Sequence, residues 1–139
     1  MTSVPAVTVP APAKLTVSLR VTGVRADGYH ELDAEMVTLD LADEVVFADG
    51  GSGLVVAAEP GVHADRLPPA EHNLIGRALS ACGRSASVRL TKRIPLGGGL
   101  GGGSADAAAV LRWSGCTDPA LAASLGADVP FCVVGSTRR

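Results

Sequence analysis

Polar and apolar residues alternate along several stretches of the chain, a pattern that predicts half-buried β-strands. The clearest stretch has Leu15, Val17, Leu19 and Val21 on one face and Lys14, Thr16, Ser18 and Arg20 on the other. It predicts a strand whose polar face begins at Lys14. Residues 1–12 have no charged side chain and predict an extended lead-in, with one short edge strand over 7–9.

The same alternation predicts more strands downstream. It resumes over 37–41 and 45–47, and it returns over 54–58 and 87–93. Residues 128–134 predict a turn that leads into a last strand. Apolar residues three or four positions apart predict helices from Asn73 to Ala81, from Ser104 to about Trp113, and over 119–125, where Gly126 ends the helix. Strands and helices without regular βαβ alternation indicate an α+β fold.

Composition limits the classes of protein that this chain can be. Its 139 residues suit one domain, and 47% hydrophobic with 19% charged residues is globular. A net charge of −2 gives no general attraction to nucleic acid. No apolar run is long enough to cross a membrane, and the N-terminus lacks a signal-peptide pattern. Cys82, Cys116 and Cys132 form no CxxC pair, so we expect thiols in a soluble, cytoplasmic protein.

Six glycines in the seven positions 97–103 lie between a predicted strand and a predicted helix. Glycine lets the backbone approach a ligand closely, and consecutive amides can converge on an anion. The helix expected to begin at Ser104 adds unpaired N–H groups and the positive end of its dipole. The segment therefore predicts a phosphate-binding loop rather than a linker, because linkers are usually flanked by polar sequence.

Two other nucleotide-binding motifs do not fit this spacing. A P-loop requires a lysine before the serine, and position 103 is glycine. A dinucleotide-binding motif requires an acidic residue about twenty positions later, at the end of a strand. Asp118 lies near that spacing, but Pro119 follows it and no apolar strand precedes it.

Four motifs, in order along nearly the whole chain, resemble the GHMP kinase family. They are Pro12-Ala13-Lys14-Leu15, the run 25–32 around Asp27, Gly28, Tyr29 and His30, the glycine-rich run 95–105, and Gly126-Ala127-Asp128-Val129-Pro130. The two glycine triplets resemble one branch of the family in particular. That branch phosphorylates the 2-hydroxyl of 4-diphosphocytidyl-2-C-methyl-D-erythritol in isoprenoid precursor biosynthesis.

The resemblance implies a GHMP kinase N-terminal domain over 1–139, with a mixed sheet packed against helices, and a kinase that uses ATP and Mg²⁺. Asp128 would be the base or orienting carboxylate, with Lys14 beside it as a compensating charge. Tyr29 would stack on the cytosine and His30 would hydrogen-bond its edge, with Thr16 also near the substrate. Nucleotide contacts would come from Asn73, Leu74, Lys92, Pro95, Leu96, Gly97, Gly98, Gly99, Leu100, Gly101, Gly102, Gly103, Ser104, Ala105 and Asp106. No protein metal ligand and no oligomeric state is implied.

Three departures from the family leave alternatives open. Thr16 stands where this branch has asparagine, the segment 113–119 is roughly ten residues short (about 15 Å of helix), and the family's C-terminal domain is expected to be absent. The alternatives are a catalytically incomplete nucleotide-binding fragment, or a GHMP kinase for another alcohol such as mevalonate or homoserine. From the sequence alone, Asp128 could merely cap a turn, and Lys92 with Arg93 could be a solvated strand end.

Overall fold

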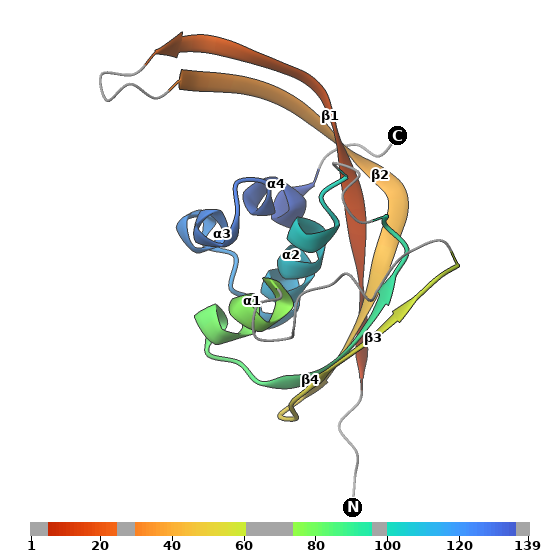
Figure 1. Ribbon diagram of the computed structural model, residues 1–139. Coiled ribbons are helices and arrows are strands. Elements are labelled where there is room, and N and C mark those ends of the chain that lie inside the picture. The colour runs from red at the N-terminus through yellow and green to blue at the C-terminus, as the bar shows by residue number, and fades with distance from the viewer. Residues whose placement is uncertain (1–5, 25–29, 61–73, 96–99, 136–139) are drawn as a thin grey trace, which may run out of the picture.

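The computed structural model describes residues 6–24, 30–60, 74–95 and 100–135 (Figure 1). Two long strands, β1 (Val7–Val24) and β2 (His30–Asp49), pair antiparallel along their whole length. In Figure 1 one end of this ribbon extends well past the helices. The pairing register shifts at three points, and one shift falls between Pro12 and Lys14.

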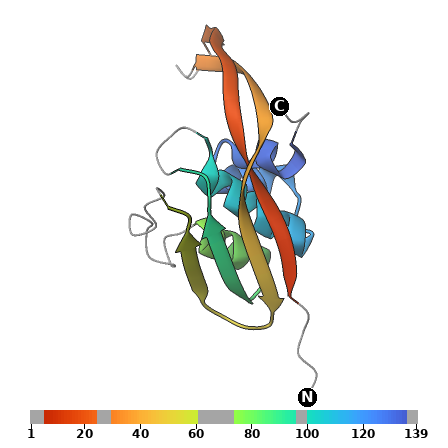
Figure 2. The same ribbon diagram turned by 90° about the vertical axis from the view of Figure 1, so that its right-hand side faces the viewer.

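A four-stranded mixed sheet is formed in the order β1-β2-β4-β3. The strand β4 (Ala86–Lys92) is antiparallel to β2, and β3 (Leu54–Ala58) is parallel to β4. The helices are α1 (Leu74–Cys82), α2 (Gly102–Ser114), α3 (Pro119–Leu125) and α4 (Val129–Val134). All four lie on one face of the sheet, as the two views show (Figures 1 and 2). The predicted α+β fold is confirmed.

The core lies between this sheet and α2. Every residue of α2 from Ala105 to Leu111 is buried, and four of these seven are alanines. Small side chains let the helix lie close to the sheet, where Val45, Phe47, Val88 and Leu90 point inward from β2 and β4. None of the helices in the described ranges is long and apolar enough to cross a membrane.

Most of the elements predicted downstream of residue 50 are confirmed, including β3, α1, β4 and α3. The helix α2 begins two residues before the expected Ser104, so part of the second glycine triplet is helical. The lead-in and first strand are one continuous strand, which corrects the predicted break at residue 12.

The predicted faces of the first strand are wrong at the described positions. Lys14 is only 8% exposed, whereas Leu15 is 43% and Val17 50% exposed. The cause is the register shift between Pro12 and Lys14: Ala13 and Lys14 are consecutive yet both buried. An irregularity of this kind interrupts the alternation of faces: Lys14 is buried, and Leu15, Thr16 and Val17 are all exposed.

The prediction of a strand over 128–134 is also wrong, because this segment forms α4. A short apolar run does not distinguish a strand from a buried helix by periodicity alone. Pro130 lies in the first turn of α4, where a missing N–H costs nothing. Val129, Cys132 and Val133 share the side that packs against the core, as helical spacing requires.

Candidate functional site

The described part of the glycine-rich loop leads directly into α2. Gly101 precedes the helix with φ of 71°, a left-handed conformation that favours glycine. A β-carbon at this position would lie 2.9 Å from Cε of Lys14, so a side chain here would displace the lysine. The backbone N–H of Lys14 donates to the carbonyl of Leu100 at 2.9 Å. The loop and β1 are therefore in direct contact at Lys14.

Lys14 and Asp128, the predicted catalytic pair, lie side by side. Nζ of Lys14 is 3.1 Å from Oδ2 of Asp128, and the two side chains are 10% and 37% exposed. Nζ also donates to Oγ1 of Thr16 at 3.4 Å. Among the described residues, the Asp128 carboxylate caps no amide of α4, so the interpretation as a turn cap does not describe it. Instead the carboxylate is partly open to solvent and faces the ammonium group of Lys14.

The beginnings of α2 and α4 are close to each other. A β-carbon on Gly126 would lie 3.9 Å from Oγ of Ser104 and 3.4 Å from Cγ2 of Val129. The first turn of α2 leaves backbone N–H groups without helical partners. These amides, the Ser104 hydroxyl and the Lys14–Asp128 pair therefore surround one region that suits an anion next to a base.

A second ionic cluster is buried beneath the loop. Nζ of Lys92 is 2.5 Å from Oδ2 of Asp43 and 3.1 Å from Oδ2 of Asp106, and the lysine has no exposure. Oδ1 of Asp43 accepts from the backbone N–H groups of Arg93 and Ile94 at 2.7 and 2.9 Å. A β-carbon on Gly102 would lie 3.0 Å from Nζ of Lys92. The cluster thus connects β2 and β4 to the first turns of α2.

Burial changes the pKa values in this cluster. Desolvation raises the pKa of Asp106 well above 3.8, and Asp43 adds to the rise while Lys92 opposes it. For Lys92, desolvation lowers the pKa, but the two carboxylates outweigh it and leave the pKa raised above 10.5. The stabilisation from Lys92 is therefore complete below pH 10.5 and is lost as the pH rises through the folded pKa.

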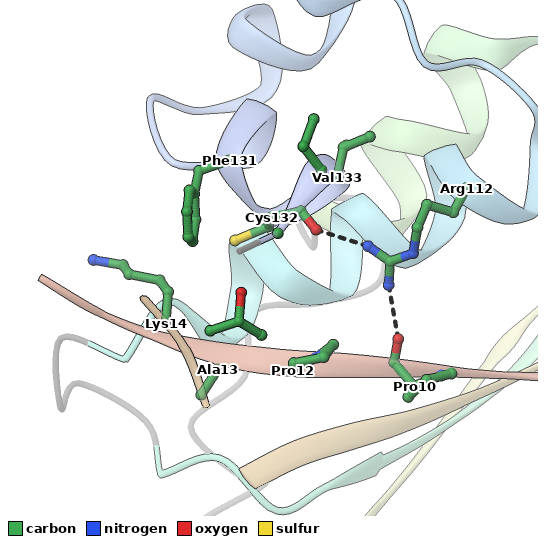
Figure 3. Close-up of a pocket in the computed structure, with 11 residues that line it drawn as sticks. Pro10, Pro12, Ala13, Lys14, Arg112, Phe131, Cys132 and Val133 are labelled. Atoms are coloured by element: carbon green, nitrogen blue, oxygen red, sulfur yellow. Dashed lines mark hydrogen bonds between the residues drawn. The ribbon is translucent and has the colours of Figure 1, made fainter. Parts of the chain in front are cut away.

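A cavity of about 290 Å³ lies between β1, α2 and α4 (Figure 3). Arg112 spans it: one guanidinium nitrogen donates to the carbonyl of Cys132 and another to that of Pro10, both at 2.7 Å. Figure 3 shows Lys14 at the same cavity. Because Lys14 is on β1 and Asp128 directly precedes α4, Arg112 holds together the two elements that carry the pair.

The remaining predicted site residues lie in different surroundings. Thr16 is exposed beside Lys14, and Pro95 is also exposed. Leu74 is half-buried, and its Cδ1 would lie 3.4 Å from a β-carbon added to Gly103. Ala105 is in the core. Lys92 is not a solvated strand end, and its ammonium group faces two carboxylates instead of a ligand. Outside the described residues are Tyr29, Asn73, Leu96, Gly97, Gly98 and Gly99. His30 begins β2, opposite Val24.

Sequence reasoning missed two residues of this region, Asp43 and Arg112. Asp43 has a detectable signal, because it shares the inward face with Val45 and Phe47, and an acid in that position needs a partner. Arg112 follows a buried stretch of α2 and has no such signal, because its carbonyl partners are set by the fold.

The buried cluster predicts a large loss of stability on Lys92→Met. This change leaves Asp43 and Asp106 facing each other without the cation, which should lower the free energy of unfolding by about 3–5 kcal/mol. The neighbouring Arg93→Met is the matched control, because the Arg93 ion pairs with Glu44 and Glu59 are exposed and should be worth about 0–1 kcal/mol. Urea titration of both variants measures the difference. Equal losses would contradict the cluster's structural role.

The raised pKa of Asp106 predicts how the free energy of unfolding changes with pH. Between 3.8 and its raised folded pKa, the folded chain binds more protons than the unfolded chain, so stability from this group is lost as the pH rises. Asp106→Asn removes that titration. Its free energy of unfolding relative to wild type should therefore increase from about pH 4 toward neutrality, as measured by urea unfolding at several pH values. The exposed Asp40→Asn is the control, and a pH-independent difference for Asp106→Asn would refute the assignment.

The two hydrogen bonds of the Arg112 guanidinium predict that a lysine, which keeps only the charge, will hold α4 less firmly against β1. Arg112→Lys keeps the charge but cannot donate in both directions, and should cost about 1–2 kcal/mol. Alkylation of Cys132 should become faster, because α4 loosens against β1. The exposed Arg77→Lys should change neither quantity. An unchanged alkylation rate in Arg112→Lys would show that the guanidinium does not hold α4.

Comparisons with known proteins point to one family. The family model described as the GHMP kinases N terminal domain matches residues 73–115, from α1 into the start of the turn after α2. The 4-diphosphocytidyl-2-C-methyl-D-erythritol kinase of Paracoccus denitrificans (strain Pd 1222) is 48% identical over 123 residues, covering 88% of this chain and 44% of that protein. The enzyme of the same name from Dechloromonas aromatica (strain RCB) is 44% identical over 137 residues, covering 91% and 50%.

Solved structures give the same result. A crystal structure of 4-(cytidine 5'-diphospho)-2C-methyl-D-erythritol kinase matches with a TM-score of 0.67 and 41% identity, over 92% of this chain and 49% of that one. The homoserine kinase of Cytophaga hutchinsonii matches with a TM-score of 0.54 and 25% identity, over 95% and 43%. The chain spans about half the length of the curated relatives that it matches. It belongs to the GHMP kinase family and has the fold of that family's N-terminal domain.

Proposed function

We propose that this chain is the ATP-binding part of a cytoplasmic kinase that phosphorylates the 2-hydroxyl of 4-diphosphocytidyl-2-C-methyl-D-erythritol. The observation that carries the proposal is the Lys14–Asp128 pair at 3.1 Å, next to the glycine-flanked start of α2. The proposed substrate is taken from the names of the relatives. Because these relatives are about twice as long, the activity is proposed for the whole kinase, and residues 1–139 for one domain of it.

Phosphoryl transfer depends on alignment and charge compensation more than on covalent help from the protein. In the proposed mechanism, Asp128 accepts or orients the proton of the substrate hydroxyl. Lys14 offsets charge that develops on the transferred group. The backbone amides at the start of α2, together with Ser104, hold the phosphates. Lys92 supports the loop from below and does not touch the nucleotide.

The donor set near this region fits Mg²⁺ bound together with ATP. No group of three or more candidate metal ligands occurs among the described His, Cys, Asp and Glu residues. Mg²⁺ commonly needs only one or two carboxylates, with phosphate oxygens and water completing its shell. Ser104 and the phosphate oxygens would hold it here, and Asp128 would stay available to the substrate hydroxyl. The ion would neutralise charge on the phosphates.

Contacts to the rest of the substrate are proposed from the sequence motifs. Thr16 is exposed beside Lys14, close enough to the pair to meet the sugar alcohol. Tyr29 and His30 would bind the cytosine, and Asn73 with Leu74 would lie near the adenine. Two alternatives remain as outcomes of the test. One is an incomplete nucleotide-binding fragment. The other is a kinase for another alcohol, such as homoserine, because the chain is also similar to a homoserine kinase.

The test is ATP-dependent phosphorylation of 4-diphosphocytidyl-2-C-methyl-D-erythritol by the whole kinase and by residues 1–139 alone, each compared with its Asp128→Asn variant. Loss of the carboxylate should lower turnover by about 10²–10⁴-fold and leave ATP affinity nearly unchanged. Asp40→Asn, an exposed carboxylate on β2, is the control and should retain turnover.

Each alternative has its own result. ATP binding without turnover in the wild-type chain would favour the incomplete fragment. Phosphorylation of homoserine in preference to the diphosphocytidyl substrate would favour the other alcohol. Turnover that survives Asp128→Asn would refute the role given to Asp128.

A further inference from the structure

Two cysteines lie together at the far end of α2 from the proposed phosphate site. Cys82 is the last residue of α1, and Cys116 follows Gly115, where α2 ends. The hydroxyl of Ser114 contacts both: it donates to Sγ of Cys82 at 3.4 Å and accepts from the backbone N–H of Cys116 at 3.4 Å. The two cysteines therefore adjoin one hydroxyl group, although they belong to different elements.

The pKa of Cys82 responds to these neighbours. Burial raises it, the Ser114 hydroxyl opposes the shift, and the neighbouring Cys116 adds to the rise. Cys132, on α4, is in different surroundings, where burial raises its pKa to about 11.

We propose that Cys82 and Cys116 form a reversible intramolecular disulfide, making this a modification site that ties the end of α1 to the end of α2. Both residues are half-buried, so a small oxidant can reach them. Each also adjoins a left-handed glycine, Gly83 with φ of 65° and Gly115 with φ of 76°, and nothing lies within 4 Å of a β-carbon added at either glycine.

The reaction is a thiol–disulfide exchange with a small disulfide such as oxidised glutathione. The thiolate of one cysteine attacks a glutathione sulfur, which forms a mixed disulfide and releases one glutathione thiolate. The second cysteine thiolate then attacks the protein sulfur, forms the internal disulfide and releases the second glutathione. Two thiol protons go to solvent, and the two electrons reduce the oxidant. This step is independent of the proposed kinase activity.

The closed ring would run from Cys82 to Cys116, around β4, the glycine-rich loop and α2. A cross-link over such a span restricts the unfolded chain more than the folded one. The oxidised chain should therefore unfold at a higher temperature, by roughly 5–15 °C. Reduction with dithiothreitol should reverse the shift.

The experiment treats the full 139-residue chain with oxidised glutathione at mildly alkaline pH, without denaturant. Wild type should lose two of its three titratable thiols and the mass of two hydrogens, and peptide mapping should join Cys82 to Cys116. Cys132→Ser should behave identically. Cys116→Ser should stop at a mixed disulfide and gain the mass of one glutathione moiety on Cys82.

Three results would overturn the proposal. The chain could keep all three thiols, it could retain a stable glutathione adduct in wild type, or it could pair Cys132 or a second chain. Cys132→Ser leaves both proposed partners in place, so it remains informative even if Cys116→Ser does not fold.

Discussion

Burying the ammonium group of Lys92 removes it from water at a cost of several kcal/mol, and this cost is offset only because two carboxylates meet it from other elements. Asp43 comes from β2 and Asp106 from α2, while Lys92 ends β4. Asp43 is further satisfied by two backbone amides directly after β4. Three elements distant in sequence are therefore fixed at one point, directly beneath the start of α2.

Two carboxylates around one ammonium group leave an excess negative charge if all three are ionised. The raised pKa of Asp106 shows how the cluster responds, because this carboxyl holds a proton more readily than usual. Oδ1 of Asp106 has no hydrogen-bond partner among the described residues, which adds to the cost of its charged form. A phosphate at the neighbouring helix start would then face amides and Lys14 with little repulsion from below.

The sequence predicts the parts of this structure that depend on local pattern. The inward faces of β4 and α1, the glycine-bounded α3 and the glycine-rich turn before α2 all follow from spacing and turn chemistry. The faces of β1 do not, because the register shift near Lys14 depends on its pairing with β2. The helix α4 was missed because Val129 to Val134 fits either secondary structure, and its packing against α2 decides between them. The proximity of Lys14 and Asp128 came from the family motifs, since no local rule connects residues so far apart.

The two lysines of this region differ in the number and exposure of their carboxylate partners. Lys92 forms ion pairs with two carboxylates and has no exposure, so its role is structural. Lys14 has one carboxylate partner, and that partner is more than a third exposed. Because the Asp128 carboxylate is partly exposed, the pair is open on one side, where a ligand can approach it. Since the Arg112 hydrogen bonds keep β1 and α4 together, Lys14 and Asp128 can change partners while their backbones stay in place. A frame of this kind keeps the two side chains aligned, and phosphoryl transfer depends on alignment.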